Sequence, residues 1–493
     1  MATTTAVGAS YSSQHPDYIE QSKKWILIQD VLKGELAVKA KTIKYLPLEN
    51  SDNSADTTEF GKRYALYLEK AKFYNATART LSGFVGQVFN KQATQEFPEK
   101  VKYLQDDPCG TGITLEQLAK GTLANTVSYG RCGLWVDFPE TGGSYTAAEV
   151  KEKAIRPVIT RYEPLNILNW RTTKLGAKTL LSLVVLREKV LVEDNEFESR
   201  YEDQFRVLRL TDGVYTVQIY KPWLSDSVWQ KVVTPTDNAG KPFEEIPFVF
   251  IGIQTNDFVV DEAPLYDMAS LNIAHYRNSA DYEEACFMVG QPMIWYSGLD
   301  EAWVRDVMKG TVRLGSRGGI PLPSGGAAGL LQVASNTMCK EAMDQKESQM
   351  IALGARIVRE SNVAKTATEV NSDKVSEVST LAAGARSTSS GLRNAFAFCQ
   401  KFAGTNVEIK YELATDFDMT RMTSQELLAI VTAWQAGLIV TESVYDIFTR
   451  AGYVTMPLKD AQAKGLAMNP PVATDKPAAP TDNRATPKPA SSV

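Results

Sequence analysis

Residues 367–403 read ATEVNSDKVSEVSTLAAGARSTSSGLRNAFAFCQKFA, without proline and with apolar or small side chains recurring at helical spacing. These side chains stand at positions 370, 378, 381, 385, 392, 396, 399 and 403. Thr366 and Glu369 form a capping box, in which each side chain satisfies a free backbone N–H of the first helical turn. The pattern predicts one long helix over 367–404, about 55 Å in length, with one buried face.

Two further helices and a compact insert are predicted upstream of this long helix. A polar break at 361–366 precedes it, and apolar spacing predicts a helix over 337–360. Another helix is predicted over 264–290, opened by a proline whose missing N–H costs no hydrogen bond at that position. Residues 291–336, between the two helices, predict a small α/β insert.

The chain before residue 264 changes from helical to strand-forming patterns. Residues 1–16 predict a disordered leader, and residues 17–263 predict a mixed α/β region with antiparallel strands. Helices are predicted over 17–33, 60–89 and 114–127, and strands at 134–136, 157–159, 181–192, 205–210, 215–219, 228–233 and 246–253. Asp212 and Gly213 separate two of the strands, which predicts a tight hairpin because glycine tolerates positive φ.

Residues 405–455 predict a strand followed by a helical region. The strand covers 406–414, and two helices with threonine caps cover 423–437 and 441–452. Residues 456–493 are rich in proline and alanine, which predicts a disordered tail. The whole pattern predicts an α+β fold.

The composition is that of a soluble globular protein with a large core. The 493 residues carry 53 basic and 58 acidic side chains, for a net charge of −5, and 44% are apolar. The longest near-continuous apolar run, 246–253, is far shorter than the ~18 residues that a membrane helix needs. The first basic residue is Lys23, so no secretory signal is visible, and we expect synthesis in a cytoplasm.

Catalytic and metal-binding patterns are missing from the sequence. Two histidines, His15 and His275, are too few for a histidine metal cluster, and no Gly-x-x-x-x-Gly-Lys-Ser/Thr loop occurs. The five cysteines are far apart and never spaced Cys-x-x-Cys, so we expect small buried thiols without disulfides. They are Cys109, Cys132, Cys286, Cys339 and Cys399. We therefore predict a protein that is not an enzyme and uses no metal or cofactor.

Several short strings occur in a characteristic order between residues 17 and 454. They are Tyr45-Leu46-Pro47, Phe73-Tyr74-Asn75 followed by Gly83, Gly86 and Val88-Phe89, the run Gly130-Arg131-Cys132-Gly133-Leu134-Trp135-Val136-Asp137, Asn169-Trp170-Arg171 and Ile246-Pro247-Phe248. Together with the helix–insert–helix–break–long helix block after residue 264, they resemble the portal (head-tail connector) proteins of tailed bacteriophages. That family was long catalogued as a domain of unknown function.

The resemblance implies a portal-protein fold and gives each segment an expected part. Residues 17–263 would form the wing, 264–290 and 337–360 the two stem helices that line a channel, and 291–336 the clip. Residues 361–366 would be the tunnel loop, 367–404 the long wing helix, and 405–455 the last wing strand and the helical crown. Twelve copies would form a ring at one capsid vertex.

Three sets of residues are candidates for function within those parts. The tunnel loop would place Ser361, Asn362, Val363, Ala364 and Lys365 in the channel, where Lys365 either contacts phosphate or is an ordinary exposed lysine. Glu341, Asp344 and Glu347 are spaced three apart, so they share a helix face that either faces the channel or is an ordinary solvated face. Trp295 and Trp303 lie in an insert too small to bury much core, so we expect a clip interface between subunits.

The resemblance also implies partners and a location. The ring would pass double-stranded DNA without sequence specificity during packaging and ejection, and would bind the large terminase subunit, a tail adaptor, the major capsid protein and scaffolding protein. It would sit at the portal vertex of a virion assembled in a bacterial cytoplasm, with no membrane contact. Two alternatives remain: another structural virion protein, such as an adaptor, or a helix-turn-helix DNA-binding protein built on 423–436 and 441–451.

Overall fold

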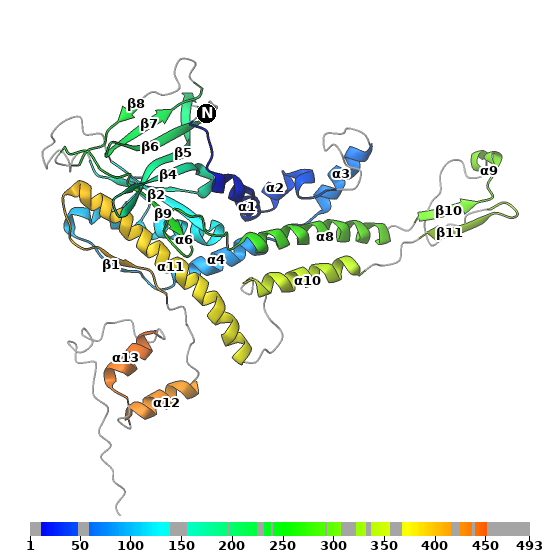
Figure 1. Cartoon of the computed structure of the whole chain (residues 1–493). Helices are drawn as coiled ribbons and strands as arrows, with labels where there is room; N and C mark the ends of the chain where they lie inside the picture. Colours follow the sequence, from blue (N-terminus) through cyan, green and yellow to red (C-terminus); the bar gives the residue numbers. More distant parts are fainter. Residues whose placement is uncertain are drawn as a thin grey trace, which may run out of the picture. The chain divides into compact units, whose positions relative to one another are not determined.

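The computed structural model describes residues 11–47, 59–138, 155–195, 197–223, 231–237, 240–290, 293–306, 322–331, 337–354, 367–415, 424–435 and 439–450. The chain divides into a large unit, Met1–Thr415, and a small unit, Asp416–Val493. Helices and strands are mixed in the large unit, which confirms the predicted α+β class (Figure 1).

The helices of the large unit are α1 (Pro16–Lys33), α2 (Glu35–Lys39), α3 (Glu59–Lys70), α4 (Ala76–Val88), α5 (Tyr103–Asp106), α6 (Leu115–Tyr129), α8 (Tyr266–Gly290), α9 (Glu301–Asp306), α10 (Met338–Ala352) and α11 (Ala367–Ala403). Short 3-10 turns are η1 (Thr42–Lys44), η2 (Glu99–Val101) and η3 (Pro164–Asn166). The small unit contains α12 (Ser424–Gln435) and α13 (Thr441–Arg450), both close to their predicted ranges.

The strands form four antiparallel sheets. The largest has the order β4 (Ile167–Leu175), β5 (Lys178–Asn195), β6 (Glu198–Thr211), β7 (Val214–Tyr220) and β8 (Lys231–Val233). The second has the order β3 (Val158–Tyr162), β2 (Arg131–Asp137) and β9 (Phe248–Gly252). Two-stranded sheets join β1 (Thr94–Glu96) to β12 (Lys410–Glu412) and β10 (Met293–Ser297) to β11 (Ala327–Leu331).

The five-stranded sheet is a meander that contains the expected hairpin at Asp212-Gly213. Both residues take positive φ, 52° and 77°, as a two-residue type I′ turn requires. The Trp135 indole N–H of β2 donates to the Tyr215 hydroxyl of β7 over 3.0 Å, and both side chains are buried. The two larger sheets therefore meet at a satisfied buried polar contact.

Helix α11 covers the three-stranded sheet, and its bounds confirm the predicted long helix to within one residue at its end. The predicted core positions Leu381, Ala385, Leu392, Phe396 and Cys399 are all buried. Glycine allows the close approach to β9: a Cβ at Gly391 would lie 2.4 Å from the Ile251 side chain. The small residues of α11 therefore set how closely the helix lies on the sheet.

Arg131, in the quoted Gly130–Asp137 run, is almost completely buried beside the connection from β9 to α8. Its guanidinium donates to three carbonyl oxygens, those of Asp257 (3.4 Å), Phe258 (3.4 Å) and Val259 (2.8 Å). It also lies over the rings of Trp170 (4.8 Å) and Phe250 (3.7 Å). The Trp170 indole N–H donates to the same Phe258 carbonyl (3.1 Å). These contacts fix the segment that leads into α8.

The predicted single helix over 60–89 is wrong, because the chain is extended between α3 and α4. Asn75 caps α4 by accepting a hydrogen bond from the Ala78 N–H (3.1 Å). The extended residues 71–75 pack on α8, whose polar side chains satisfy their backbone groups. The spacing of apolar residues in this segment cannot reveal that α8 will bind it, because α8 lies about 200 residues away in the sequence.

The predicted disorder of residues 1–16 is wrong for residues 11–16. The Tyr11 ring stacks on Tyr220 of β7 at 4.9 Å, and the His15 ring stacks on Trp170 of β4 at 3.9 Å. The Asn169 side chain donates to the Ser13 carbonyl (3.0 Å). Aromatic contacts to the five-stranded sheet therefore hold this segment in place.

The second helix of the predicted pair ends at Ala352 rather than at Glu360. Gly354 follows with a φ of 106°, a left-handed conformation typical of the residue after a helix end. Residues 355–366 lie outside the described part of the chain. The apolar side chains after Ala352 misled the prediction, because they continue the helical spacing past a glycine stop.

The Arg131 contacts predict a large loss of stability on substitution. Arg131→Met removes the hydrogen bonds to all three carbonyl oxygens, of which only that of Phe258 keeps another donor, the Trp170 indole N–H, so the free energy of unfolding should fall by about 2–4 kcal/mol. Urea unfolding followed by tryptophan fluorescence measures the change. The matched control is Arg171→Met, at an exposed arginine on β4, where we expect a change within about 0.5 kcal/mol. Equal effects of the two substitutions would contradict this role for Arg131.

Candidate functional site: the α8–α10 helix pair and its insert

The first half of α8 is held to the rest of the large unit by polar side chains. Asn272 accepts hydrogen bonds at its side-chain oxygen from the Thr77 N–H (3.3 Å) and hydroxyl (3.0 Å), and its amide donates to the Tyr74 carbonyl (2.6 Å). Two turns later, the Ser279 hydroxyl donates to the Lys72 carbonyl (2.7 Å) and accepts from the Lys72 N–H (3.2 Å). Asn272 and Ser279 thus replace the backbone partners that residues 71–75 would have in a helix.

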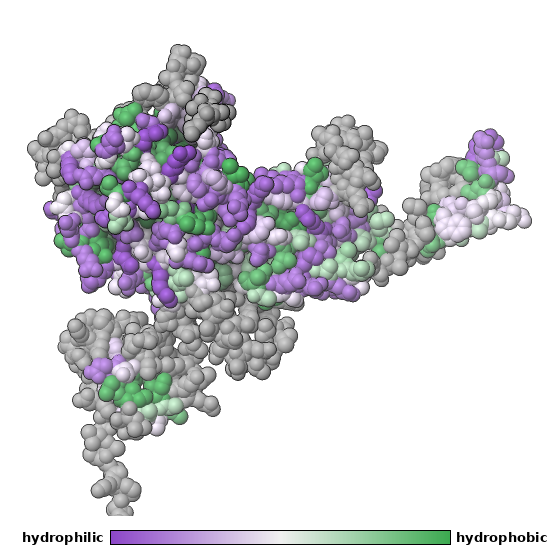
Figure 2. Space-filling view, in the orientation of Figure 1, coloured by the Kyte–Doolittle hydropathy of each residue, from purple (hydrophilic) through white to green (hydrophobic). Residues whose placement is uncertain are grey.

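The second half of α8 has fewer partners, and those described come from α3. The Tyr67 hydroxyl donates to the Asp281 carboxylate (2.6 Å), and Arg63 pairs with Glu284 (3.3 Å). Beyond them, Phe287 and Met288 are about half exposed, and Met338 at the start of α10 is 70% exposed. Figure 2 shows green patches at this end of the pair and on the insert, so apolar surface gathers there.

Helix α10 packs against α8 around a buried histidine. His275 is only 3% exposed, and neither ring nitrogen has a hydrogen-bond partner among the described residues. Its Nε2 lies 3.6 Å from a carboxylate oxygen of Glu347 on α10, beyond hydrogen-bond distance, and its ring lies 5.9 Å from the Tyr74 ring. Burial lowers the pKa of His275, and Glu347 only partly offsets this effect.

The three carboxylates of α10 do not share one solvent-facing surface. Glu341 and Asp344 are exposed, and Glu341 accepts a hydrogen bond from the Thr337 hydroxyl (2.8 Å). Glu347 is half-buried at the contact with His275. Only Glu341 and Asp344 of this set therefore present their charge freely.

Both helices of the pair have more acidic than basic residues. Helix α8 has four acidic residues against one arginine, for a net charge of −3. Helix α10 has three acidic residues against two lysines, for a net charge of −1. The pair therefore carries a net charge of −4.

The insert between the helices is a β-hairpin with a short helix, as the α/β pattern predicts. Trp295 of β10 pairs with Gly329 of β11, and a Cβ on that glycine would lie 2.8 Å from the indole nitrogen. The indole therefore lies flat over Gly329, with 44% of Trp295 exposed. Trp303 on α9 is half-buried, and its indole N–H has no partner within the described residues. Both tryptophans remain candidates for an interface.

Other predicted site residues are placed only in part. The segment 361–365 lies outside the described residues, so the geometry of the expected tunnel loop stays a prediction. The expectation that all five cysteines are buried is correct for Cys132 and Cys399 but wrong for Cys286, which is exposed on the second half of α8, while Cys109 and Cys339 are only half-buried. In the described residues, no group of three His, Cys, Asp or Glu side chains could hold a metal ion.

The rival interpretation as a helix-turn-helix protein can be compared with the described residues. Helices α12 and α13 contain one basic residue, Arg450, so a recognition helix for DNA phosphates has almost no positive charge. None of the described helices combines the length and the apolar character needed to cross a bilayer.

Asn272, His275 and Ser279 are functional candidates that the sequence reasoning missed. They lie on one face of α8 at spacings of three and four residues, and all three are buried. A stripe of small polar side chains on an otherwise apolar helix face was the available signal, because buried polar groups need partners.

Comparison with known proteins gives a family match and structural matches. A family described as a domain of unknown function (DUF4055) matches residues 264–403, from just before α8 to the end of α11. A chain from the neck of a native GTA particle computed with C12 symmetry has 10% identity and a TM-score of 0.36, covering 79% of this chain and 90% of its own. A chain from the neck of an empty GTA particle computed with C6 symmetry has 12% identity and a TM-score of 0.40, with coverages of 81% and 91%. No curated protein sequence matches the chain.

His275 predicts a pH dependence of the helix pair. Its pKa is lowered in the folded state, so its contribution to stability is complete above the unfolded value of 6.5 and is lost as the pH falls through the folded value. The charges that face it are Glu347, Lys346 and Asp344 on α10. We expect the urea midpoint to fall between pH values of about 7.5 and 5.5, and to fall less in His275→Gln.

The control for this measurement is the other histidine. His15→Gln should leave exchange protection of α8 and α10 as pH-sensitive as in the wild type, since His15 contacts the five-stranded sheet. Hydrogen exchange of the two helices at both pH values separates the sites. An unchanged pH response in His275→Gln would show that His275 does not titrate in this range.

Proposed function

We propose that this chain is a portal protein: copies of it form a ring at one vertex of a phage-type capsid, and DNA enters and leaves through the ring. The observation that carries the proposal is the α8–α10 pair, held to the large unit at one end and bearing the β10–β11 insert at the other. This arrangement and the long helix α11 over the wing sheet correspond to the stem, clip and wing helix that the sequence motifs imply.

Assembly into a ring accounts for the bare end of the helix pair. Phe287, Met288 and Met338 are exposed in the isolated chain, and within the small insert Trp295 is 44% exposed. Contiguous exposed apolar side chains mark surfaces that a partner covers. In the proposed ring, neighbouring stems and clips supply the cover, and Trp295 and Trp303 lie at the clip interface.

The charge of the pair suits a conduit better than a DNA-binding site. A tight DNA binder gathers lysine and arginine, which release counterions from the phosphates. Here Glu341 and Asp344 face the channel, with Glu347 adding its charge from the contact with α8. A channel of this kind repels the duplex from its wall and lets it move.

The remaining parts follow from the same arrangement. The tunnel loop, Ser361 to Lys365, forms the narrowest collar, with Lys365 as its one cation. The clip, residues 291–336, binds the large terminase subunit and later the tail adaptor, and the wing contacts capsid and scaffolding protein. Double-stranded DNA passes without sequence specificity, and the ring itself needs no cofactor and catalyses no reaction.

Oligomeric state is the first test of the proposal. The purified 54.3 kDa chain should give one dominant assembly at an integral multiple of its mass by native mass spectrometry, with about twelve subunits expected from the resemblance. Negative-stain images should show a central hole. A stable monomer across a range of salt and protein concentrations would contradict the proposal.

Charge reversal in the stem tests the conduit. Glu341→Lys with Asp344→Lys adds two cations per subunit to the channel wall, so rings should retain duplex DNA about tenfold more at ~50 mM salt, and salt above ~200 mM should release it. Filter retention of a labelled linear duplex measures the effect, and heads filled in vivo should decrease. The matched control is Glu20→Lys with Glu99→Lys, at exposed sites on α1 and η2. Equal retention by both variants would show that the two acids do not line the channel.

A further inference from the structure

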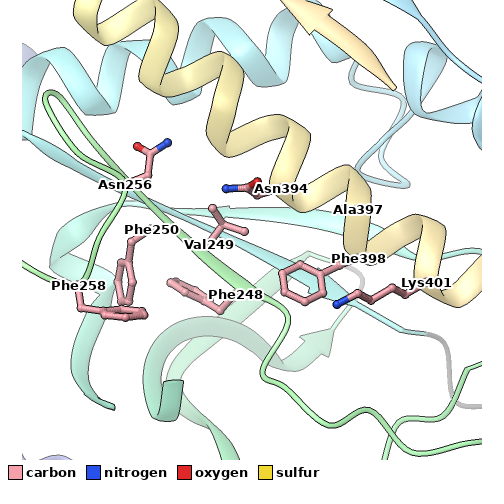
Figure 3. A pocket seen from close by; sticks show the side chains of 9 residues that line it. All are labelled: Phe248, Val249, Phe250, Asn256, Phe258, Asn394, Ala397, Phe398 and Lys401. Carbon is pink, nitrogen blue, oxygen red and sulfur yellow. The ribbon is translucent and has the colours of Figure 1, made fainter. Parts of the chain in front are cut away.

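An open pocket of about 290 Å³ lies between the β9 strand and α11 (Figure 3). Its floor is formed by Phe248 and Phe250, and its walls by Phe258 and Phe398. Asn394 and Lys401 of α11 stand at the exposed rim. A cavity of about 150 Å³ holds a benzene molecule, so this pocket has room for an aromatic side chain.

The pocket follows the outer edge of β9, the end strand of its sheet. Phe248 and Val249 both line the pocket, although neighbouring residues of a strand point to opposite faces of the sheet. The pocket therefore lies at the edge of the strand rather than over one face of the sheet. The Val136 N–H donates a hydrogen bond to the Pro247 carbonyl, and in an antiparallel pair only every second residue makes such bonds to the partner strand. The backbone N–H and C=O of Phe250 therefore point away from β2, toward the side of the pocket. The site therefore offers aromatic walls beside a strand edge.

A matching apolar projection lies on another face of the same chain. Phe197, at the tip of the β5–β6 hairpin, is 90% exposed, and Tyr201 nearby is also exposed. A phenylalanine at a hairpin tip gains little from its own fold when only about a tenth of its surface is covered, as for Phe197. Such a side chain gains free energy only when a second surface covers it.

The charges around the two features are opposite. Asp194 and Glu198 flank the tip, and neither makes an ion pair with a described residue. Between residues 380 and 403, α11 carries Arg386, Arg393 and Lys401 and no acidic residue. Lys401 pairs with Glu245 and Arg393 with Glu412 (3.6 Å) within the chain, so the side of α11 beside the pocket is left with a net positive charge that is smaller than its cations alone suggest. An acidic tip is thus complementary to the basic helix beside the pocket.

We propose that Phe197 of one copy inserts into the Phe248–Phe398 pocket of the next copy. Tip and pocket are different surfaces, so the contact is heterologous, and heterologous contacts that close generate rings. The inference rests on the proposed ring and specifies one contact that joins neighbouring wings. The occupant is a second copy of this chain, because the chain itself supplies the complementary knob and charge.

Photo-crosslinking tests the contact in the full assembly. With p-benzoylphenylalanine at position 197, rings mixed from isotopically light and heavy subunits should give mixed dimers whose adducts map to 248–258 or 394–401. The matched control places the same group at Leu175, an exposed residue at the opposite end of the five-stranded sheet, and should give no adduct in the pocket. Adducts that join 197 to other surfaces, or no dimers at all from intact rings, would overturn the inference.

Substitution on each side of the contact gives an independent test. Phe197→Ala removes the knob, and Ala397→Trp fills the pocket from the exposed face of α11, so each should lower the ring fraction about tenfold at limiting protein concentration with unchanged circular dichroism. The double variant should be no worse than either single variant. Normal ring formation by both variants would overturn the wing contact and leave the proposed function intact, whereas a wild-type monomer would overturn both.

Discussion

The buried guanidinium of Arg131 is the interaction on which the large unit most depends. A cation without water must be surrounded by acceptors, and here three consecutive carbonyl oxygens, at 257–259, supply them between two aromatic rings. Those carbonyls belong to the connection from β9 to α8, where the Asp261 carboxylate also accepts from the Gln254 N–H (2.8 Å). The three-stranded sheet and α8 are consequently fixed to each other, and the direction in which α8 leaves the sheet is set by a contact that cannot relax at low cost.

The two halves of α8 differ in how many contacts they make with the rest of the large unit. Its first half forms hydrogen bonds with the backbone of residues 71–75. Because of these bonds α3 and α4 are two separate helices, and the segment between them is held by a specific polar contact. Its second half and the start of α10 leave apolar and acidic side chains uncovered. In the proposed ring, neighbouring subunits would cover that end, while the contacts of the first half keep α8 attached to the rest of the large unit.

Local signals in the sequence were enough for the long helix and the Asp212-Gly213 hairpin, since each depends on residues a few positions apart, whereas the predicted cap at Thr366 lies outside the described residues. The predictions that were wrong concern features that depend on contacts between residues far apart in the sequence. The break at 71–75 depends on Asn272 and Ser279, the ordered segment before α1 depends on the stacking of Tyr11 and Tyr220, and β4 was not expected at all. In the candidate site, spacing placed Glu341, Asp344 and Glu347 together, but the contact of Glu347 with His275 across the helix pair cannot be read from one helix alone.

The central claim is that DNA passes beside the α8–α10 pair, and contact between DNA and α10 inside filled particles tests it most directly. A photoreactive side chain at position 344 in assembled, genome-filled particles should form DNA adducts, while the same group at Glu20 on the wing should form none. Particles lacking DNA provide the background. Adducts at 344 and not at 20 are the predicted result; absence of adducts at 344 in filled particles would contradict the assignment of this helix pair to the channel.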